Sequence, residues 1–183
     1  MLARMHREVQ PVPALLQHRR PDRAVPQREL QTFAQHLWNG PGDDERTRAV
    51  LADLDQLDEV ANSGPASFIH GDCHLGNALH DGSGRLLLVD WQSSAVGPSA
   101  GDLAFALTRA VPTGADIPRD RAVAAYCDES GADLAQTERR ITARQILTLI
   151  TQYPEFAGFL GEPEVRRLRA ELDALLQRWT TRG

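Results

Sequence analysis

The stretch from residue 66 to residue 91 constrains the fold of this 183-residue chain more than any other part of the sequence. A short apolar segment, residues 66–69, leads into the polar run His-Gly-Asp-Cys-His-Leu-Gly-Asn at 70–77. Residues 78–80 and 85–89 flank a glycine-containing turn, which favours a hairpin. The pattern predicts a strand, a polar loop and a hairpin whose buried, leucine-rich second strand ends at Asp90.

Three polar residues of this stretch, Asp72, Asn77 and Asp90, have the chemistry that phosphoryl transfer needs. Asn77 follows Asp72 by five positions and Asp90 follows Asn77 by thirteen, so a tight loop and hairpin can return them to one cleft. We expect Asp72 to be the catalytic base that orients a hydroxyl and accepts its proton. We expect the oxygens of Asn77 and Asp90 to hold Mg²⁺. Taken alone, each residue could instead cap a turn or a strand end.

These residues resemble the catalytic loop and metal aspartate of kinases, in the form used by the aminoglycoside phosphotransferase and choline kinase family of small-molecule kinases. The segment Gly-Pro-Ser-Ala-Gly-Asp-Leu-Ala at 97–104 resembles the family's helix start after the metal aspartate. The segment Leu-Ala-Arg-Met-His at 2–6 resembles the Leu-Ala-x-x-His helix that opens the family's C-terminal lobe. The resemblance is specific over residues 66–106. Trp91 stands where protein kinases have Phe, which favours a small acceptor over a protein.

The resemblance implies a fold, a reaction and its cofactors. The expected fold is α+β and mainly helical, a protein-kinase-like C-terminal lobe with a small β-hairpin beside the catalytic loop. The expected reaction transfers the terminal phosphate of ATP or GTP, with Mg²⁺, to a hydroxyl of a small molecule such as an aminoglycoside, amino alcohol or sugar. Acidic residues of the later helices would select a cationic acceptor, with Asp128, Glu129 and Glu155 as candidates.

Several neighbours of Asp72 are expected to support it. The His70 imidazole can bond the loop backbone and hold Asp72 in place, and the resemblance implies that Asp102 supports the same loop by hydrogen bonds. Gly71 allows a backbone bend or a close approach of another segment, and Cys73 is expected to be a small packed residue. His74 either contacts substrate or phosphate or lies at the loop surface, and we favour the surface position.

Apolar periodicity predicts the remaining elements. Helices are expected over 1–9 and 28–38, from Asp43 or Asp44 to Val60, and over 101–110, 119–129, 134–151 and 162–180. Residues 10–27 contain four prolines and predict an irregular loop, and the run Asn-Gly-Pro-Gly at 39–42 predicts a helix end.

All 20 basic residues are arginine, so the chain has no lysine to grip nucleotide phosphates, and it has no glycine-rich phosphate loop. We therefore expect residues 1–183 to form a single domain like a kinase C-terminal lobe, without the N-terminal nucleotide-binding lobe. Within it, residues 66–106 would be the catalytic core and residues 107–183 a helical subdomain on the acceptor side. The chain alone is expected to have very weak activity or none. An exposed cleft would favour self-association or a partner that provides the missing lobe.

Composition limits the other functions. A net charge of −5 without a basic cluster gives no basis for nucleic-acid binding. No apolar run approaches membrane-spanning length, and the start of the chain is too polar for a signal peptide, so we expect a cytoplasmic protein. The two cysteines are too far apart to predict a disulfide scaffold or a zinc site.

Two other functions are consistent with parts of the sequence. A metal-dependent hydrolase could use His70, Asp72 and His74 as ligands, with His80 as a fourth, but Asn77 and Asp90 would then have no explanation. A non-catalytic kinase remnant could bind a ligand or partner, although the presence of Asp72, Asn77 and Asp90 argues against loss of the site.

Overall fold

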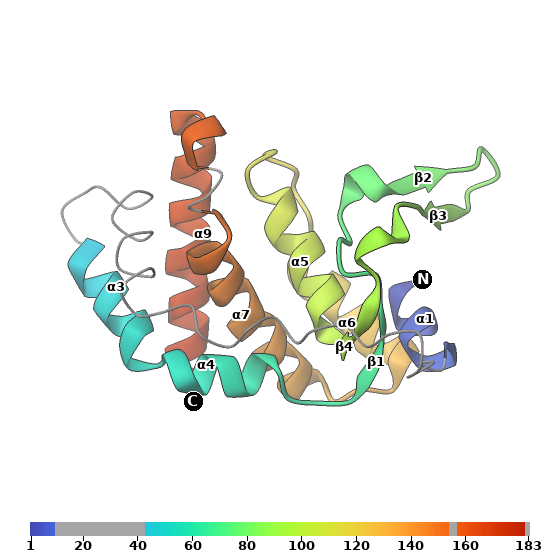
Figure 1. The fold of residues 1–183 in the computed structure, drawn as a ribbon, viewed down its shortest axis with the longest axis horizontal. Helices are drawn as coiled ribbons and strands as arrows, with labels where there is room; N and C mark the ends of the chain where they lie inside the picture. Colours follow the sequence, from blue (N-terminus) through green and yellow to red (C-terminus); the bar gives the residue numbers. More distant parts are fainter. Residues whose placement is uncertain (10–42, 154–156, 182–183) are drawn as a thin grey trace.

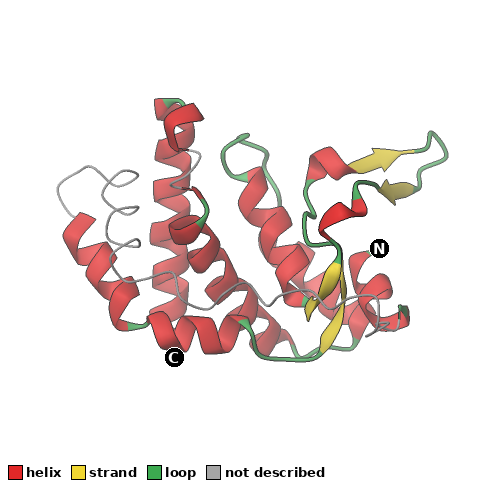
Figure 2. Cartoon of the chain, in the orientation of Figure 1, coloured by secondary structure: helices red, strands yellow, loops and turns green. Residues whose placement is uncertain are grey.

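The computed structural model describes residues 1–9, 43–153 and 157–181. The expected loop at 10–27, the helix at 28–38, its end at 39–42 and Glu155 lie outside these residues. The described part is mainly helical with two small antiparallel sheets, which confirms the predicted fold class (Figures 1 and 2). The helices are α1 (Leu2–Glu8), α3 (Asp43–Ala52), α4 (Leu54–Ala61), α5 (Ala100–Ala110), α6 (Arg119–Ser130), α7 (Leu134–Thr151) and α9 (Glu162–Thr181).

Helix α7 is the centre of the fold because it packs against α4, α5, α6 and α9. Its apolar residues enter two cores. One core joins α7 to α4 and α9 through side chains such as Leu57, Leu149 and Leu172. The other joins Ile141 of α7 to α1, α5 and α6, with Ala3 and Val123 among its members. Because α7 is buried on more than one side, polar residues such as Glu138, Thr142 and Gln145 are buried along it together with its apolar ones.

The strands form two separate pairs. β1 (Ala66–Ile69) pairs with β4 (Ala95–Pro98), so that Ala66 faces Pro98 and Ile69 faces Ala95. β2 (Ala78–His80) pairs with β3 (Leu86–Leu88), with Leu79 facing Leu87. The short 3₁₀ helices η1 (Leu75–Asn77) and η2 (Trp91–Ser93) precede β2 and β4. Figure 1 shows the β2–β3 hairpin at the end of the molecule opposite α3 and α9. The pairing of β1 with β4 was not predicted.

Two expectations need correction. The predicted helix up to Val60 is divided at Asp53, whose carboxylate accepts a 2.9 Å hydrogen bond from the indole nitrogen of Trp179. The leucine-rich strand β3 was expected to be buried, yet Leu86 and Leu87 are exposed. The reason is that β3 belongs to a two-stranded hairpin, and Leu86 and Leu87, which point to opposite faces of it, are not covered by any other described element.

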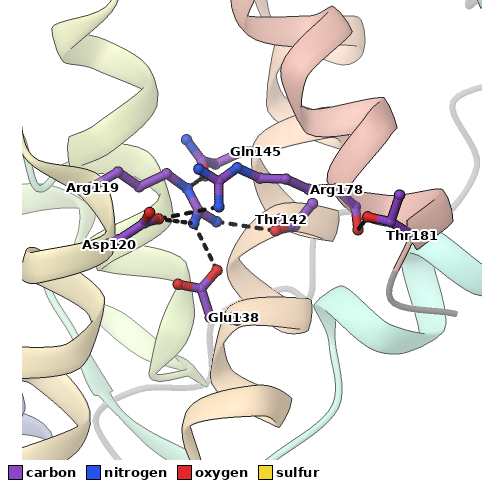
Figure 3. Close-up of polar contacts among 7 residues, drawn as sticks. All are labelled: Arg119, Asp120, Glu138, Thr142, Gln145, Arg178 and Thr181. Atoms are coloured by element: carbon purple, nitrogen blue, oxygen red, sulfur yellow. Dashed lines mark hydrogen bonds and ion pairs between the residues drawn. The ribbon is translucent and has the colours of Figure 1, made fainter.

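A polar cluster joins α6, α7 and α9, and Figure 3 shows it. The Arg119 guanidinium at the start of α6 donates to Glu138 Oε2 at 2.6 Å, Thr142 Oγ1 at 3.0 Å and Gln145 Oε1 at 3.2 Å, all on α7. Asp120 accepts a 3.1 Å hydrogen bond from Arg178 of α9. Among the described residues, no helix is both long and apolar enough to cross a membrane.

Candidate active site

The loop after β1 is attached to the first turn of α5 by Asp102. The backbone N–H of His70 donates to Asp102 Oδ2 at 2.7 Å, and the N–H of Gly71 donates to Oδ1 at 2.9 Å. The Asp102 carboxylate is almost completely buried, with 2% exposure, and the partial positive charge of the helix N-terminus favours it there. It does not cap α5, since its oxygens face the loop. The loop therefore has a fixed starting point relative to α5.

His70 joins the same loop to the end of β3. Its ring is fully buried, with Nε2 2.9 Å from the carbonyl oxygen of Val89 and Nδ1 3.3 Å from the backbone nitrogen of Asp72. Nε2–H must donate to the Val89 carbonyl, and Nδ1 accepts from the Asp72 N–H, so the pattern requires the neutral Nε2-protonated tautomer. The Trp91 ring lies beside the His70 ring, with the two ring centroids 4.5 Å apart.

Asp72 and Asn77 contact each other directly. The Asn77 side-chain amide donates to the backbone oxygen of Asp72 at 3.0 Å and to Asp72 Oδ2 at 3.1 Å. These two bonds fix which end of the amide faces Asp72, and Asn77 Oδ1 makes no hydrogen bond to any described residue. The Asp72 side chain is 33% exposed, so its carboxylate can reach a molecule outside the loop.

Asp90 lies next in the chain to the residue that pairs with Asn77. The backbone N–H of Val89 donates to the Asn77 carbonyl at 2.9 Å, which continues the β2–β3 pairing by one residue. Asp90 has φ 62° and ψ 66°, and it is the one non-glycine with positive φ among the described residues. Its side chain is exposed, and its carboxylate has no hydrogen-bond partner within the described ranges. The backbone thus holds a free carboxylate in an unfavourable conformation, a combination typical of functional sites.

The oxygen donors at this junction fit Mg²⁺. Asn77 Oδ1 and the Asp90 carboxylate are hard oxygen ligands, and both remain available after the internal hydrogen bonds are made. Mg²⁺ is commonly bound by one or two protein oxygens together with phosphate oxygens and water. Asn77 pairs with Val89 in the hairpin, and Asp90 follows Val89, so two protein oxygens are offered from one hairpin, which suits that mode.

His74 lies beside Asp72. Its Nε2 is 3.6 Å from Asp72 Oδ2, and its Nδ1 accepts a 3.0 Å hydrogen bond from the Gly76 N–H. The ring is partly exposed, and both expectations for His74 stay predictions.

Cys73 is packed inside the loop. Burial, with smaller contributions from the nearby Asp102 and Asp72 charges, raises the pKa of its thiol to about 12. A thiol with so high a pKa stays protonated at neutral pH and is a poor nucleophile.

The geometry does not favour the hydrolase alternative. Both ring nitrogens of His70 are engaged within the protein, and the exposed His80 accepts a hydrogen bond from the Gly82 N–H in the hairpin turn. Across residues 1–9, 43–153 and 157–181, no group of three or more His, Cys, Asp or Glu side chains could hold a metal ion.

The acceptor-side candidates remain a prediction. Glu129 is engaged by Arg7, whose guanidinium bonds its carboxylate at 3.2 Å, and Asp128 is exposed on α6.

The special conformation expected at Gly71 is present, but two residues that support the loop, Ser93 and His6, were not predicted to do so. A Cβ added to Gly71, which has φ +80°, would lie 2.0 Å from the carbonyl oxygen of Ser93. His6 lies 3.1 Å from Asp102 Oδ2. The Leu-Ala-x-x-His pattern was the available signal for His6, whereas nothing in the sequence indicates the contact with Ser93.

The strained backbone at Asp90 leads to a prediction. At this position Gly should be more stabilising than Ala, so the free energy of unfolding of Asp90→Gly should exceed that of Asp90→Ala by about 1 kcal/mol. On the exposed face of α6 the order should reverse, with Asp128→Ala more stable than Asp128→Gly by about 1 kcal/mol. Urea denaturation of the four variants measures both differences. An Ala variant at position 90 that equals the Gly variant would show that the backbone there is not strained.

Known proteins resemble this chain in sequence and in fold. The phosphotransferase enzyme family matches residues 1–144. Among solved structures, choline kinase LicA from Streptococcus pneumoniae is 15% identical with a TM-score of 0.51, and the match covers 96% of this chain and 60% of LicA. LicA in complex with AMP is 17% identical with a TM-score of 0.53, and this match covers 100% and 60% of the two chains. The chain thus spans about 60% of the length of these structures, and the likeness shows a shared fold. No curated protein sequence matches the chain.

Proposed function

This chain belongs to the phosphotransferase enzyme family, as its catalytic-loop residues predicted, and we propose that it takes part in transfer of the terminal phosphate of ATP or GTP to a hydroxyl of a small molecule. The observation that best supports this is the junction of loop and hairpin. Asn77 bonds Asp72 through its side chain and pairs with Val89 through its backbone, and Asp90 directly follows Val89 in the chain.

The proposed roles follow from the state of each side chain. The Asp72 carboxylate is partly exposed and oriented by the Asn77 amide, so it can accept a hydrogen bond from the acceptor hydroxyl and take its proton. Asn77 Oδ1 and Asp90 would hold Mg²⁺, which when bound neutralises charge on the phosphate oxygens. His70 and Asp102 hold the loop, and His74 would contact substrate or phosphate beside Asp72.

The same proposal assigns the parts of the chain. Residues 66–106 would be the catalytic core and residues 107–183 the acceptor side. Because the sequence contains no lysine, a lysine that clamps the nucleotide phosphates would have to come from outside these 183 residues. The exposed leucines of η1 and the hairpin, at 75, 79, 86 and 87, would then lie under the nucleotide-binding lobe that provides it.

The acceptor is proposed as a class only. Amino alcohols such as choline, aminoglycosides and sugars all present the required hydroxyl, and the structural neighbours named choline kinase favour including choline first among the acceptors tested.

We predict that Asp72→Asn and Asp90→Asn will differ in their effects. Asp72→Asn should lower the rate of transfer from radiolabelled ATP or GTP by about 10²–10⁴-fold, since it removes the proton acceptor but leaves both metal ligands. Asp90→Asn should weaken binding of Mn²⁺ in the presence of the nucleotide, measured by electron paramagnetic resonance. The exposed turn variant Asp81→Asn is the control and should change neither quantity.

The metal measurement also tests the non-catalytic alternative, since a remnant would show no saturable metal–nucleotide binding that depends on Asp90. Transfer above the uncatalysed rate that Asp72→Asn removes would exclude a remnant as well. Robust turnover by the chain alone would contradict the proposed need for an additional nucleotide clamp.

A further inference from the structure

His6 of α1 is buried against α5 and α6, two helices that are distant from it in sequence. Its side chain is 3% exposed. Its Nδ1 is 2.9 Å from the hydroxyl oxygen of Tyr126 on α6, and its Nε2 is 3.1 Å from Asp102 Oδ2 on α5. The rings of His6 and Tyr126 meet edge to face, with centroids 5.8 Å apart. Both polar atoms of the imidazole are therefore used, and one of them acts on the residue that holds the catalytic loop.

The Asp102 carboxylate determines how His6 uses its two nitrogens, because an ionised carboxylate only accepts hydrogen bonds and His6 Nε2 must therefore carry a proton. Burial raises the pKa of Tyr126, against a hydrogen bond with Ser99 that lowers it, so its O–H stays protonated and can donate to Nδ1 of His6. A neutral imidazole that accepts at Nδ1 has its proton on Nε2. The Nε2–H then donates to Asp102 Oδ2. The order of donation is from Tyr126 to His6 and from His6 to Asp102.

Asp102 needs this third donor. A carboxylate with 2% exposure is costly to bury unless several hydrogen bonds satisfy its oxygens. Oδ1 accepts from the Gly71 N–H, while Oδ2 accepts from both the His70 N–H and His6. Without His6, Oδ2 would lose one of its two donors, and nothing on the α1 side would keep the carboxylate turned so that each oxygen meets its own backbone N–H.

We propose that His6 is a positioning residue for the catalytic loop. It acts through Asp102 on the backbone of His70 and Gly71, and these residues place the Asp72 carboxylate. The hydrogen-bond network does not depend on the proposed function. The consequence for transfer through Asp72 does rest on it.

The test is hydrogen exchange at single backbone amides of the whole chain, followed by nuclear magnetic resonance. His6→Leu should speed exchange of the His70 and Gly71 amides by about tenfold or more, while amides of the core that α7 forms with α4 and α9, such as that of Leu149, exchange as before. His6→Gln can still donate to Asp102 and should keep the protection of both amides within about threefold. Arg7→Ala is the control on the same helix, because Arg7 contacts Glu129 and not Asp102.

Two results would overturn the proposal. One is unchanged exchange at His70 and Gly71 in His6→Leu. The other is faster exchange spread evenly over both cores, which indicates general destabilisation. If His6→Leu does not fold, Tyr126→Phe decides: removal of the hydroxyl should speed exchange selectively at the same two amides, and no selective change would reject the proposal. The transfer rate is measured separately, so that altered exchange without an altered rate would contradict the role of Asp72 and leave the network intact.

Discussion

Replacing Gly71 with Ala is expected to lower the free energy of unfolding by about 2–5 kcal/mol. An L-residue at φ +80° costs about 1–2 kcal/mol. The added Cβ would also lie 2.0 Å from the backbone oxygen of Ser93, where no side chain can rotate away. Forced repacking of this kind typically costs a further 1–3 kcal/mol or so. Denaturant unfolding followed by circular dichroism measures the loss.

Gly82 supplies a matched control for this prediction. It has the same φ of +80°, but a Cβ there meets nothing within 4 Å. Gly82→Ala should therefore show only the backbone cost, about 1–2 kcal/mol. The difference between the two variants isolates the contact of Gly71 with Ser93. Equal losses in the two proteins would show that the loop and η2 are not in close backbone contact.

The contact also has a functional consequence. Ser93 follows Asp90 by three positions, so a displaced Ser93 moves Asp90 relative to Asp72. The Gly71→Ala protein that remains folded should bind Mn²⁺ with nucleotide more weakly than Gly82→Ala does.

Replacing Arg119 with Met is expected to lower the free energy of unfolding by about 3–5 kcal/mol, because it removes one partner of a buried ion pair. The side chains of Arg119 and Glu138 are 12% and 7% exposed, and a guanidinium nitrogen of Arg119 lies 2.6 Å from Glu138 Oε2. The same guanidinium donates to Oε1 of the fully buried Gln145, whose amide nitrogen has no hydrogen-bond partner among the described residues. Thermal and urea unfolding measure the loss.

The loss in Arg119→Met should depend on pH. Burial raises the pKa of Glu171, and the Arg119 and Arg178 charges oppose that rise. Removing Arg119 raises the Glu171 pKa further. A carboxyl group with a raised pKa in the folded state binds its proton more tightly there than in the unfolded chain, so folding stability falls as pH rises through that range. The difference between variant and wild type should thus be larger at pH 7 than at pH 4.

Arg166→Met is the control for Arg119. Arg166 and Glu162 form an exposed pair 3.5 Å apart, with 66% and 84% exposure. Exposed pairs contribute about 0–1 kcal/mol. If Arg119→Met costs as little as Arg166→Met, the cluster in Figure 3 does not stabilise the junction of α6, α7 and α9.

The sequence by itself determined the local features of this protein. Apolar spacing gave α5, α6, α7 and α9 to within a residue or so, and the glycine-containing turn gave the β2–β3 hairpin. The family followed from the loop residues, since the spacing of Asp72, Asn77 and Asp90 is itself a local property. Such features can be predicted because helix and strand periodicity and turn chemistry depend on neighbours within a few residues.

Only the tertiary structure decided how the loop is held. His6 and Asp102 are 96 positions apart, and Asp53 and Trp179 are 126 apart. Each contact depends on where several helices pack, and a residue's own neighbours do not encode that position. The expectation that Leu86 and Leu87 would be buried was wrong for the same reason, since an apolar strand is buried only if another element covers it. Short sequence segments therefore determined which chemical groups the site contains, while packing between segments distant in sequence determined where the atoms of those groups lie.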